Sequence, residues 1–192
     1  MKKSYFERRK HMMYYRYVDM IVRGLAADAR SLIDVGSADA AYLEQWNWIP
    51  VRHALDKRKA YSSANVKALK QDFFKFQPES KYDFATCFQV LEHVEDAGAF
   101  ARKLLQISDK VLVSVPYVWP EDATPYHVQD PVDIEKVRAW FGRKEDYGLI
   151  VDEPLHGGAA SRRLIAYFAS EKPSLEEAKK RMRASLKKRV GG

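Results

Sequence analysis

The sequence predicts an α/β fold of three layers (αβα), in which a doubly wound, mostly parallel seven-stranded sheet ends in an antiparallel C-terminal hairpin. Two observations support this prediction. Short apolar runs alternate with segments of helical periodicity through the first five predicted strands, as in β–α–β units. The stretch Ser31–Ala40 passes from an apolar run into small residues, which is typical of a buried strand, a tight turn and the start of a helix.

The predicted elements follow one another with few long connections. Parallel strands are predicted in the run that begins at Ser31 and at residues 51–56, 66–72, 82–89 and 110–115. Helices are predicted at residues 11–27, 39–46, 96–107 and 133–141, the last of which is ended by Gly142. Residues 148–155 and 163–169 form the hairpin around Gly157 and Gly158. This order of elements indicates a Rossmann-like sheet.

The 192 residues are predicted to form one domain, because this length supports a single hydrophobic core. The domain is divided into an N-terminal helical region (1–30), the core (31–170) and a basic C-terminal helix (171–192). Cys87 is the single cysteine, which excludes an internal disulfide. Because the chain shows no secretory signal and no bilayer-spanning apolar run, the sequence predicts a cytoplasmic protein without a membrane partner.

The net charge of +7 is concentrated at the two ends of the chain. Residues 1–30 and 171–192 each carry eight Lys/Arg and three Asp/Glu, so each end contributes +5 and residues 31–170 carry −3. An enzyme that acts on nucleic acid usually needs a basic surface beside its site. The acidic body therefore argues against a nucleic-acid partner, and the basic ends are interpreted as solvated helix faces. A phosphate-rich partner docked on both ends is the alternative interpretation.

Acids recur at the ends or starts of consecutive predicted strands, namely Asp34, Asp56, Asp72 and Asp83. The carboxyl ends of the strands converge on one crevice in this architecture. Asp56 follows Gly36 by roughly 20 residues, a separation at which an acid after the second strand can accept hydrogen bonds from ribose hydroxyls. The glycine turn and these acids together indicate a cofactor site at this edge.

Four motifs occur in order along the chain: Asp34-Val-Gly-Ser-Ala-Asp-Ala40, Asp56, Asp72-Phe73, and Cys87-Phe-Gln-Val-Leu-Glu-His-Val94 followed by Asp96. In these motifs the sequence resembles the class I S-adenosyl-L-methionine (SAM)-dependent methyltransferases, over roughly residues 30–170. The Leu-Glu-His-Val segment is the most specific part and resembles the small-molecule subgroup of type 11-like enzymes. The G-x-G-x-x-G spacing of nicotinamide dinucleotide sites is absent.

The resemblance implies a SAM site at the ends of the first four strands. Asp34 and the glycine turn would hold the methionine end of SAM, and Asp56 would take the ribose hydroxyls. Asp72 would bond the adenine amino group, with Phe73 beside the ring, and Phe88 would offer its backbone carbonyl to the SAM ammonium. The implied cofactor-binding residues are Asp34, Gly36, Ser37, Ala38, Asp56, Lys57, Asp72, Phe73, Phe88 and Gln89.

One position departs from the family pattern. Ala38 stands where a second glycine is usual, and its methyl group disfavours positive φ. A working turn is therefore expected to hold Ala38 at negative φ, and an impaired site would point to a non-catalytic, methyltransferase-like binding subunit.

Two histidines are the candidate catalytic residues, because the usual pKa of imidazole suits a general base. His93 follows the fourth strand, and His127 lies in the Pro-containing loop 117–131 with Tyr117, Trp119 and Tyr126. The alternatives are a Glu92-His93 pair that packs under the cofactor and an exposed loop histidine. Some quinone-pathway O-methyltransferases with a similar segment hold Mg²⁺ there. Because Gln89 replaces an acid at one ligand position, no metal is expected here.

The sequence thus predicts a methyltransferase that transfers the SAM methyl group to a hydroxyl, rather than to an amine, of a small polar acceptor. The resembled subgroup includes enzymes that modify sugars, so a sugar is one candidate acceptor. The alternatives are an RNA methyltransferase that uses the basic ends as a clamp and the non-catalytic binding subunit.

Overall fold

The computed structural model describes residues 5–36, 38, 41–121, 123–154 and 160–170. Seven strands form one sheet in the order β3-β2-β1-β4-β5-β7-β6. They are β1 (Ser31–Val35), β2 (Val51–Asp56), β3 (Lys67–Lys70), β4 (Phe84–Phe88), β5 (Lys110–Pro116), β6 (Tyr147–Val151) and β7 (Arg163–Ala169). β3, β2, β1, β4 and β5 are parallel, whereas β7 is antiparallel to both β5 and β6. The predicted sheet and its antiparallel end are confirmed.

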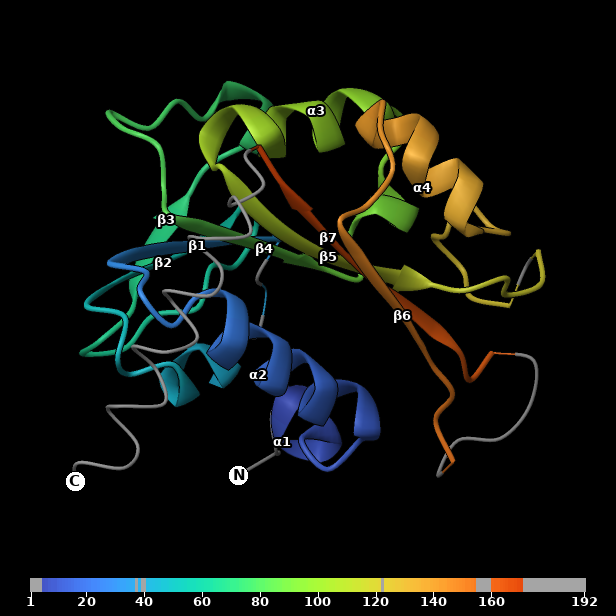
Figure 1. Cartoon of the computed structure of the whole chain (residues 1–192), viewed down its shortest axis with the longest axis horizontal. Coiled ribbons are helices and arrows are strands. Elements are labelled where there is room, and N and C mark those ends of the chain that lie inside the picture. Colours follow the sequence, from blue (N-terminus) through green and yellow to red (C-terminus); the bar gives the residue numbers. More distant parts are fainter. Residues whose placement is uncertain (1–4, 37, 39–40, 122, 155–159, 171–192) are drawn as a thin grey trace, which may run out of the picture.

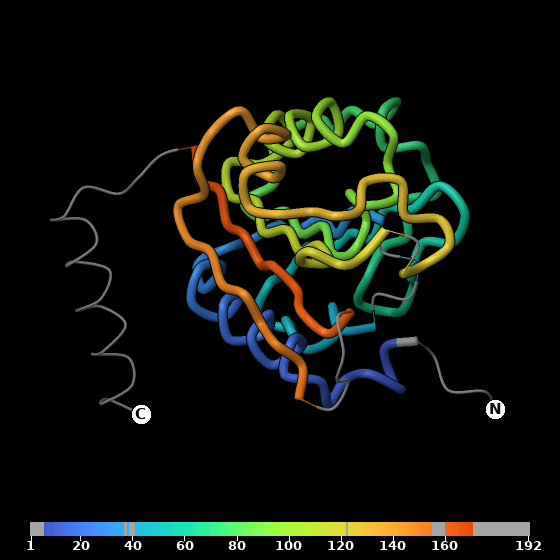
Figure 2. The backbone as a smooth tube through the Cα atoms, turned by 90° about the vertical axis from the view of Figure 1, so that its right-hand side faces the viewer, coloured from blue at the N-terminus to red at the C-terminus, as the bar shows by residue number. Residues whose placement is uncertain are grey.

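Helices cover both faces of this sheet (Figure 1). α1 (Tyr5–Arg9) and α2 (Met13–Leu25) lie on one face, and α3 (Ala97–Ile107) and α4 (Ile134–Phe141) lie on the other. Figure 2 shows the same three layers from the side. Each face has its own hydrophobic core, one built with α2 and the other with α3 and α4. This arrangement confirms the predicted αβα layers.

The helices begin and end where local chemistry dictates. The apolar stripe of α2 is buried at Tyr14, Val18, Ile21 and Val22. Its first turn has no side-chain cap of its own, and the backbone N–H of Tyr14 donates to the Glu153 carboxylate over 3.3 Å. α3 and α4 begin behind Asp caps, and α4 ends at Gly142, whose φ is 66°.

The connection after β1 differs from the prediction. The expected helix at residues 39–46 is a single 3-10 turn, η1 (Ala41–Gln45). α1 was not predicted, and its Phe6 packs edge-on against Tyr15 and Tyr42 with ring centroids 5.2 and 5.7 Å apart. Because η1 is short, α1 and α2 cover this part of the sheet.

Other predictions fall outside the described residues. These are the hairpin turn at Gly157 and Gly158, the basic C-terminal helix at 171–192 and the position of Ser37. Among the residues that the structure does describe, no helix combines the length and the apolar character needed to cross a membrane.

Candidate active site

Asp34 lies near the end of β1 and is almost completely buried, with 1% of its surface exposed. Its carboxylate accepts hydrogen bonds from the Tyr42 hydroxyl over 2.7 Å and from the Thr86 hydroxyl over 2.5 Å. Burial raises the pKa of Asp34 to about 7 although both bonds favour the ionised form, and the charge of Asp56 adds to the rise. Asp34 is thus a carboxylate that the fold itself satisfies.

The glycine turn, defined here as Gly36 and Ala38, follows directly. Gly36 has a φ of 80°, and a Cβ atom there would lie 2.4 Å from Cγ2 of Val90. Only glycine therefore fits at this position. Ala38 also adopts a positive φ, 27°, so the expectation of negative φ is wrong. The turn requires a left-handed conformation that alanine adopts only with strain.

The acids after β2 and β3 are fixed by backbone N–H groups. Asp56 ends β2 and accepts from the N–H groups of Arg58 and Lys59 over 2.7 and 2.8 Å. Asp72 accepts from the N–H of Phe74 over 2.8 Å and caps the 3-10 turn η2 (Phe73–Lys75). Both carboxylates lie at the carboxyl edge of the sheet, as expected.

Two further positions belong to the framework of the fold. Asp83 precedes β4, at a strand start as expected, and its carboxylate accepts from the N–H groups of Arg30 and Ser31, which ties the start of β1 to β4. The ring of Phe73 is 4% exposed and packs against Phe100 with centroids 4.4 Å apart. That ring is therefore part of the core, and the side chain exposed at this point is Phe74.

The end of β4 links the two cores of the molecule. Phe88 is half-buried, and its ring lies near those of Tyr14 and Tyr42, with centroids 6.5 and 5.8 Å away. Gln89 has a φ of 56°, and its side-chain amide donates to the Ser114 hydroxyl over 3.2 Å. Lys57, after β2, is exposed. The structure thus places Phe88 and Gln89 beside the strand ends that carry the acids.

A second group, named the histidine corner, consists of Glu92, His93, His127 and Asp130. Glu92 is 1% exposed, and neither of its carboxylate oxygens has a hydrogen-bond partner among the described residues. Burial raises the pKa of Glu92 to about 8, and the nearby Asp130 adds to the rise. A buried carboxylate without a partner is costly to the fold, so this position calls for a functional explanation.

Both histidines of the corner are oriented through Nδ1. His127 Nδ1 lies 2.6 Å from an Asp130 carboxylate oxygen, with both side chains at least nine-tenths buried. His93 Nδ1 donates to the Tyr126 carbonyl over 2.9 Å. The two rings meet edge-on with centroids 4.6 Å apart, and burial lowers the pKa of His93. This pattern leaves Nε2 of each ring with its lone pair.

Glu92, His93 and His127 each offer a ligand atom, and these atoms all lie within 4.8 Å of one another. From the sequence no metal was expected, because Gln89 stands at a position where an acidic ligand would be needed. His127 comes from another segment of the chain, and only the fold brings it to Glu92 and His93.

Backbone strain gathers at the same place. Among the described residues, positive φ in residues other than glycine occurs only at Ala38, Gln89, Val118 and Tyr126. The first belongs to the glycine turn, Gln89 follows β4, and the carbonyl of Tyr126 accepts the hydrogen bond from His93. Such strain persists where the surrounding structure enforces it, which is typical of functional sites.

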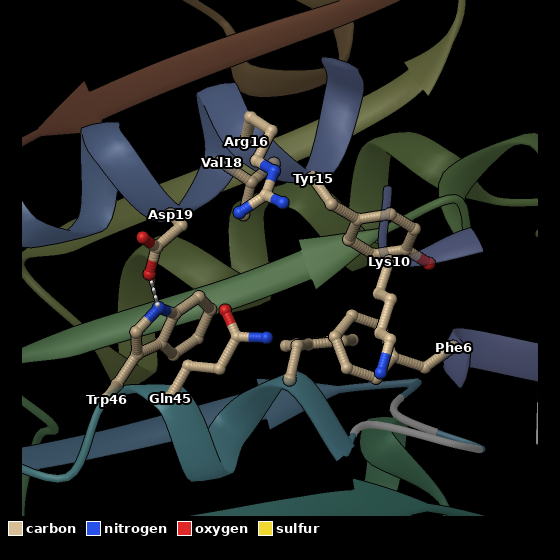
Figure 3. Close-up of a pocket in the computed structure, with 9 residues that line it drawn as sticks. Phe6, Lys10, Tyr15, Arg16, Val18, Asp19, Gln45 and Trp46 are labelled. Carbon is tan, nitrogen blue, oxygen red and sulfur yellow. Dashed lines mark hydrogen bonds between the residues drawn. The ribbon is translucent and has the colours of Figure 1, made fainter. Parts of the chain in front are cut away.

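A pocket that Tyr42 also lines lies between α1, α2 and η1 (Figure 3). Lys10 and Arg16 line it, and the Trp46 indole donates to Asp19 over 3.1 Å on its floor. Neither the acids of the strand ends nor the histidines line this pocket, so it is separate from the candidate active site.

A family model described as a methyltransferase domain matches residues 9–146. This chain belongs to that methyltransferase family. The matched segment includes both the glycine turn and the histidine corner. The chain is therefore a class I SAM-dependent methyltransferase, and its cofactor is SAM, as the sequence motifs predict. None of the curated proteins matches the chain in sequence.

Solved structures of methyltransferases share the fold. The N-methyltransferase NodS from Bradyrhizobium japonicum WM9, with S-adenosylhomocysteine (SAH), has a TM-score of 0.65 at 13% identity and covers 86% of this chain and 91% of its own. The Burkholderia thailandensis 1,6-didemethyltoxoflavin-N1-methyltransferase has a TM-score of 0.63 at 13% identity, and the match covers 86% of this chain and 82% of its own. The magnesium protoporphyrin IX methyltransferase from Synechocystis PCC 6803, with bound SAM, has a TM-score of 0.59 at 15% identity, and the match covers 88% of this chain and 86% of its own.

Proposed function

We propose that this methyltransferase transfers the SAM methyl group to a hydroxyl of a small polar acceptor at the histidine corner. The observation that carries the proposal is the buried His127–Asp130 pair, joined over 2.6 Å. A carboxylate on Nδ1 fixes the tautomer, so that Nε2 presents its lone pair to the acceptor hydroxyl. A hydroxyl gains most from such a base because its own pKa is high, whereas a neutral amine attacks with its lone pair.

The glycine turn and the acids of the strand ends fit the cofactor. We assign the methionine end of SAM to Asp34, Gly36 and Ala38, together with Ser37. Support comes from the positive φ at Gly36 and Ala38, which turns backbone groups towards the edge of the sheet. The acids after β2 and β3, fixed by backbone N–H groups, are assigned to the ribose and the adenine.

Three further positions complete the proposed cofactor site. Phe88 would present its backbone carbonyl to the SAM ammonium at the end of β4. Lys57 and Gln89 flank the strand ends and would cover the ribose and the methionine. Phe73 would contribute through its backbone, because its ring is in the core.

When bound, SAM supplies a methyl group already activated by its sulfonium. The chain then has to align the acceptor oxygen with that methyl group and remove the proton of the acceptor hydroxyl. As the oxygen–carbon bond forms and the carbon–sulfur bond breaks, Nε2 of His127 takes the hydroxyl proton and Asp130 stabilises the imidazolium. The products are the methyl ether and SAH.

Apolar side chains around His127 favour a compact polar acceptor with an apolar face. Val118, Tyr126 and Val128 of the loop are 40, 84 and 55% exposed. Trp119 stacks on His127 with centroids 5.8 Å apart and donates to the Arg162 carbonyl over 2.7 Å. Aromatic rings of this kind stack on sugar or planar rings, and a sugar is one acceptor of this class.

The test is a comparison of His127→Ala with the control His11→Ala, an exposed residue outside the site. Radiolabelled SAM is offered with panels of sugars, phenols and amines, and SAH affinity is measured by calorimetry. We expect methylation of a hydroxyl panel member, a loss of turnover of about 100-fold or more in His127→Ala, and unchanged SAH affinity in both variants. Methylation confined to amines, or unchanged turnover in His127→Ala, would contradict the proposal.

A further inference from the structure

We propose that Glu92, His93 and His127 bind a divalent first-row transition-metal cation. Glu92 supplies the first argument, because it is 1% exposed and both its oxygens lack a hydrogen-bond partner among the described residues. Native proteins rarely leave a buried carboxylate in that condition unless it is paired or bound to a metal. The partner has to come from outside the described part of the chain, and a cation is the partner that a carboxylate prefers.

The orientation of the two histidines is the second argument. Metal-binding histidines generally donate their other ring N–H to a carboxylate or a backbone carbonyl, which fixes the ring and the tautomer. His127 makes such a bond to Asp130 over 2.6 Å, and His93 makes one to the Tyr126 carbonyl over 2.9 Å. Nε2 of each ring is thereby left as the neutral ligand atom that a metal requires.

Distance is the third argument. One ligand atom of each of the three residues lies within 4.8 Å of the other two. Around a bound ion, ligand atoms lie about 3 to 3.5 Å apart, because each is about 2.1 Å from the metal. Small side-chain rotations close that difference, and the exposed position of His93 leaves room for them.

The donor set selects the class of metal. Two imidazoles and one carboxylate suit Mn²⁺, Fe²⁺, Co²⁺, Ni²⁺ or Zn²⁺, whereas Mg²⁺ and Ca²⁺ prefer sites made of oxygen ligands. Three protein ligands also leave coordination positions open, as in catalytic sites. This arrangement differs from the one expected on sequence, in which Gln89 occupied a ligand position and no metal was bound.

In its catalytic meaning, this inference rests on the hydroxyl acceptor of the proposed function and, with the ion bound, replaces the role of base given there to His127. A hydroxyl bound at an open position of the ion loses its proton more readily. His127 would then act as a ligand, and the proton would leave to solvent instead of to His127. The binding of the ion itself does not depend on the identity of the acceptor.

The test uses the full chain without a histidine tag, first stripped with a chelator. Co²⁺ is added as the probe, and its visible absorption reports coordination by imidazole and carboxylate; Mn²⁺ and Zn²⁺ affinities follow by calorimetry. We expect about one ion per chain in the wild type and affinity lower by a factor of 10 or more in Glu92→Gln and in His127→Ala. For Asp130→Asn, which removes an orienting bond, the expected loss is about 10- to 100-fold.

Glu153→Gln is the matched control. Glu153 is also 1% exposed and has one oxygen without a partner among the described residues, but within that part of the chain it belongs to no cluster with histidines, and its other oxygen accepts from the first turn of α2. This variant should bind the ion as the wild type does. An unchanged Co²⁺ spectrum in Glu92→Gln, or the absence of binding by the folded wild type, overturns the inference.

The two proposals fail in different ways. If the ion binds as described and no hydroxyl is methylated, the metal site stands and the proposed function falls. If a hydroxyl is methylated at the same rate with chelator present and no ion binds, the proposed function stands and the metal site falls.

Discussion

Two carboxylates at the carboxyl edge of the sheet are both 1% exposed but differ in their hydrogen bonding. Asp34, at the glycine turn, receives hydroxyl hydrogen bonds from Tyr42 and Thr86. Glu92, at the histidine corner, has no hydrogen-bond partner among the described residues. The difference indicates that the first carboxylate is completed within the fold beside the glycine turn. The second is completed by nothing in the described part of the chain.

The largest effect is expected in the glycine turn, at Gly36, which lies against Val90. Gly36→Ala would place Cβ 2.4 Å from Val90 and force alanine to a φ of 80°, so we expect a loss of about 3 kcal/mol in the free energy of unfolding, together with loss of SAH binding. Chemical denaturation and calorimetry measure the two quantities.

Gly142→Ala is the matched control, since Gly142 also has a positive φ, 66°, but a Cβ there meets nothing within 4 Å. This control should lose only about 1 kcal/mol. Adding Val90→Ala to Gly36→Ala should recover part of the loss. An equal loss in the two glycine variants would show that the contact with Val90 is unimportant.

The next effect tests the hydrogen bonds of the two carboxylates directly. Thr86→Val removes one donor from Asp34 without a large change of shape, and we expect it to cost about 2 kcal/mol of stability. Glu92→Gln removes no hydrogen bond and should cost less than about 0.5 kcal/mol in metal-free buffer. Denaturation curves of both variants under one set of conditions give the comparison. Equal costs would remove the contrast between the two sites.

The pH dependence of stability gives a smaller effect. Burial raises the pKa of Asp34 from its usual 3.8 to about 7, so between these values the folded state holds a proton that the unfolded chain has lost. The stability due to this proton is fully present below pH 3.8 and is lost as the pH rises through 7.

Asp34→Asn removes this linkage. We therefore expect the stability of the variant relative to the wild type to increase by about 1.4 kcal/mol between pH 6 and pH 8, as measured by urea denaturation. Asp56 also acts on Asp34, and it remains in both proteins, so its contribution cancels in the comparison. A difference that does not change with pH would show that Asp34 titrates normally.

The smallest effect is expected at Ala38. Ala38→Gly removes the strain of a φ of 27°, so SAH affinity should rise by about threefold to fivefold, which corresponds to about 1 kcal/mol. The control is Ala41→Gly in η1, where no strain is relieved and no gain is expected. Calorimetric titration with SAH measures both. Weaker binding by Ala38→Gly would show that the methyl group of Ala38 contributes a contact.

The sheet could be predicted from sequence because its signals are local. Buried parallel strands read as short apolar runs, and the predicted strand at residues 51–56 matches β2 residue for residue. Asp133 and Gly142 likewise mark the ends of α4 through bonds within one or two turns. After β1 the local signals indicated a short helical stretch, and the structure has one there in 3-10 form, η1.

In the candidate site, too, features with a local sequence signal could be predicted and contacts between distant segments could not. The glycine turn and the acids at Asp34, Asp56 and Asp72 were found from the sequence, because they follow strands at regular positions. Asp83 lies at the start of β4, which the sequence allowed, but its bonds to the backbone at the start of β1 could not be foreseen. The donors to Asp34 were missed, since Tyr42 and Thr86 lie on separate elements.

The sequence by itself determined the αβα fold, the SAM motifs and the two candidate histidines. Tertiary structure alone decided that Asp34 is satisfied, that Glu92 finds no partner among the described residues, and that His127 joins His93 beside Glu92. The physical reason is that burial and hydrogen bonding depend on which distant segments meet. Sequence patterns report spacing along one element, whereas the chemistry of a buried carboxylate depends on neighbours that the fold brings from elsewhere in the chain.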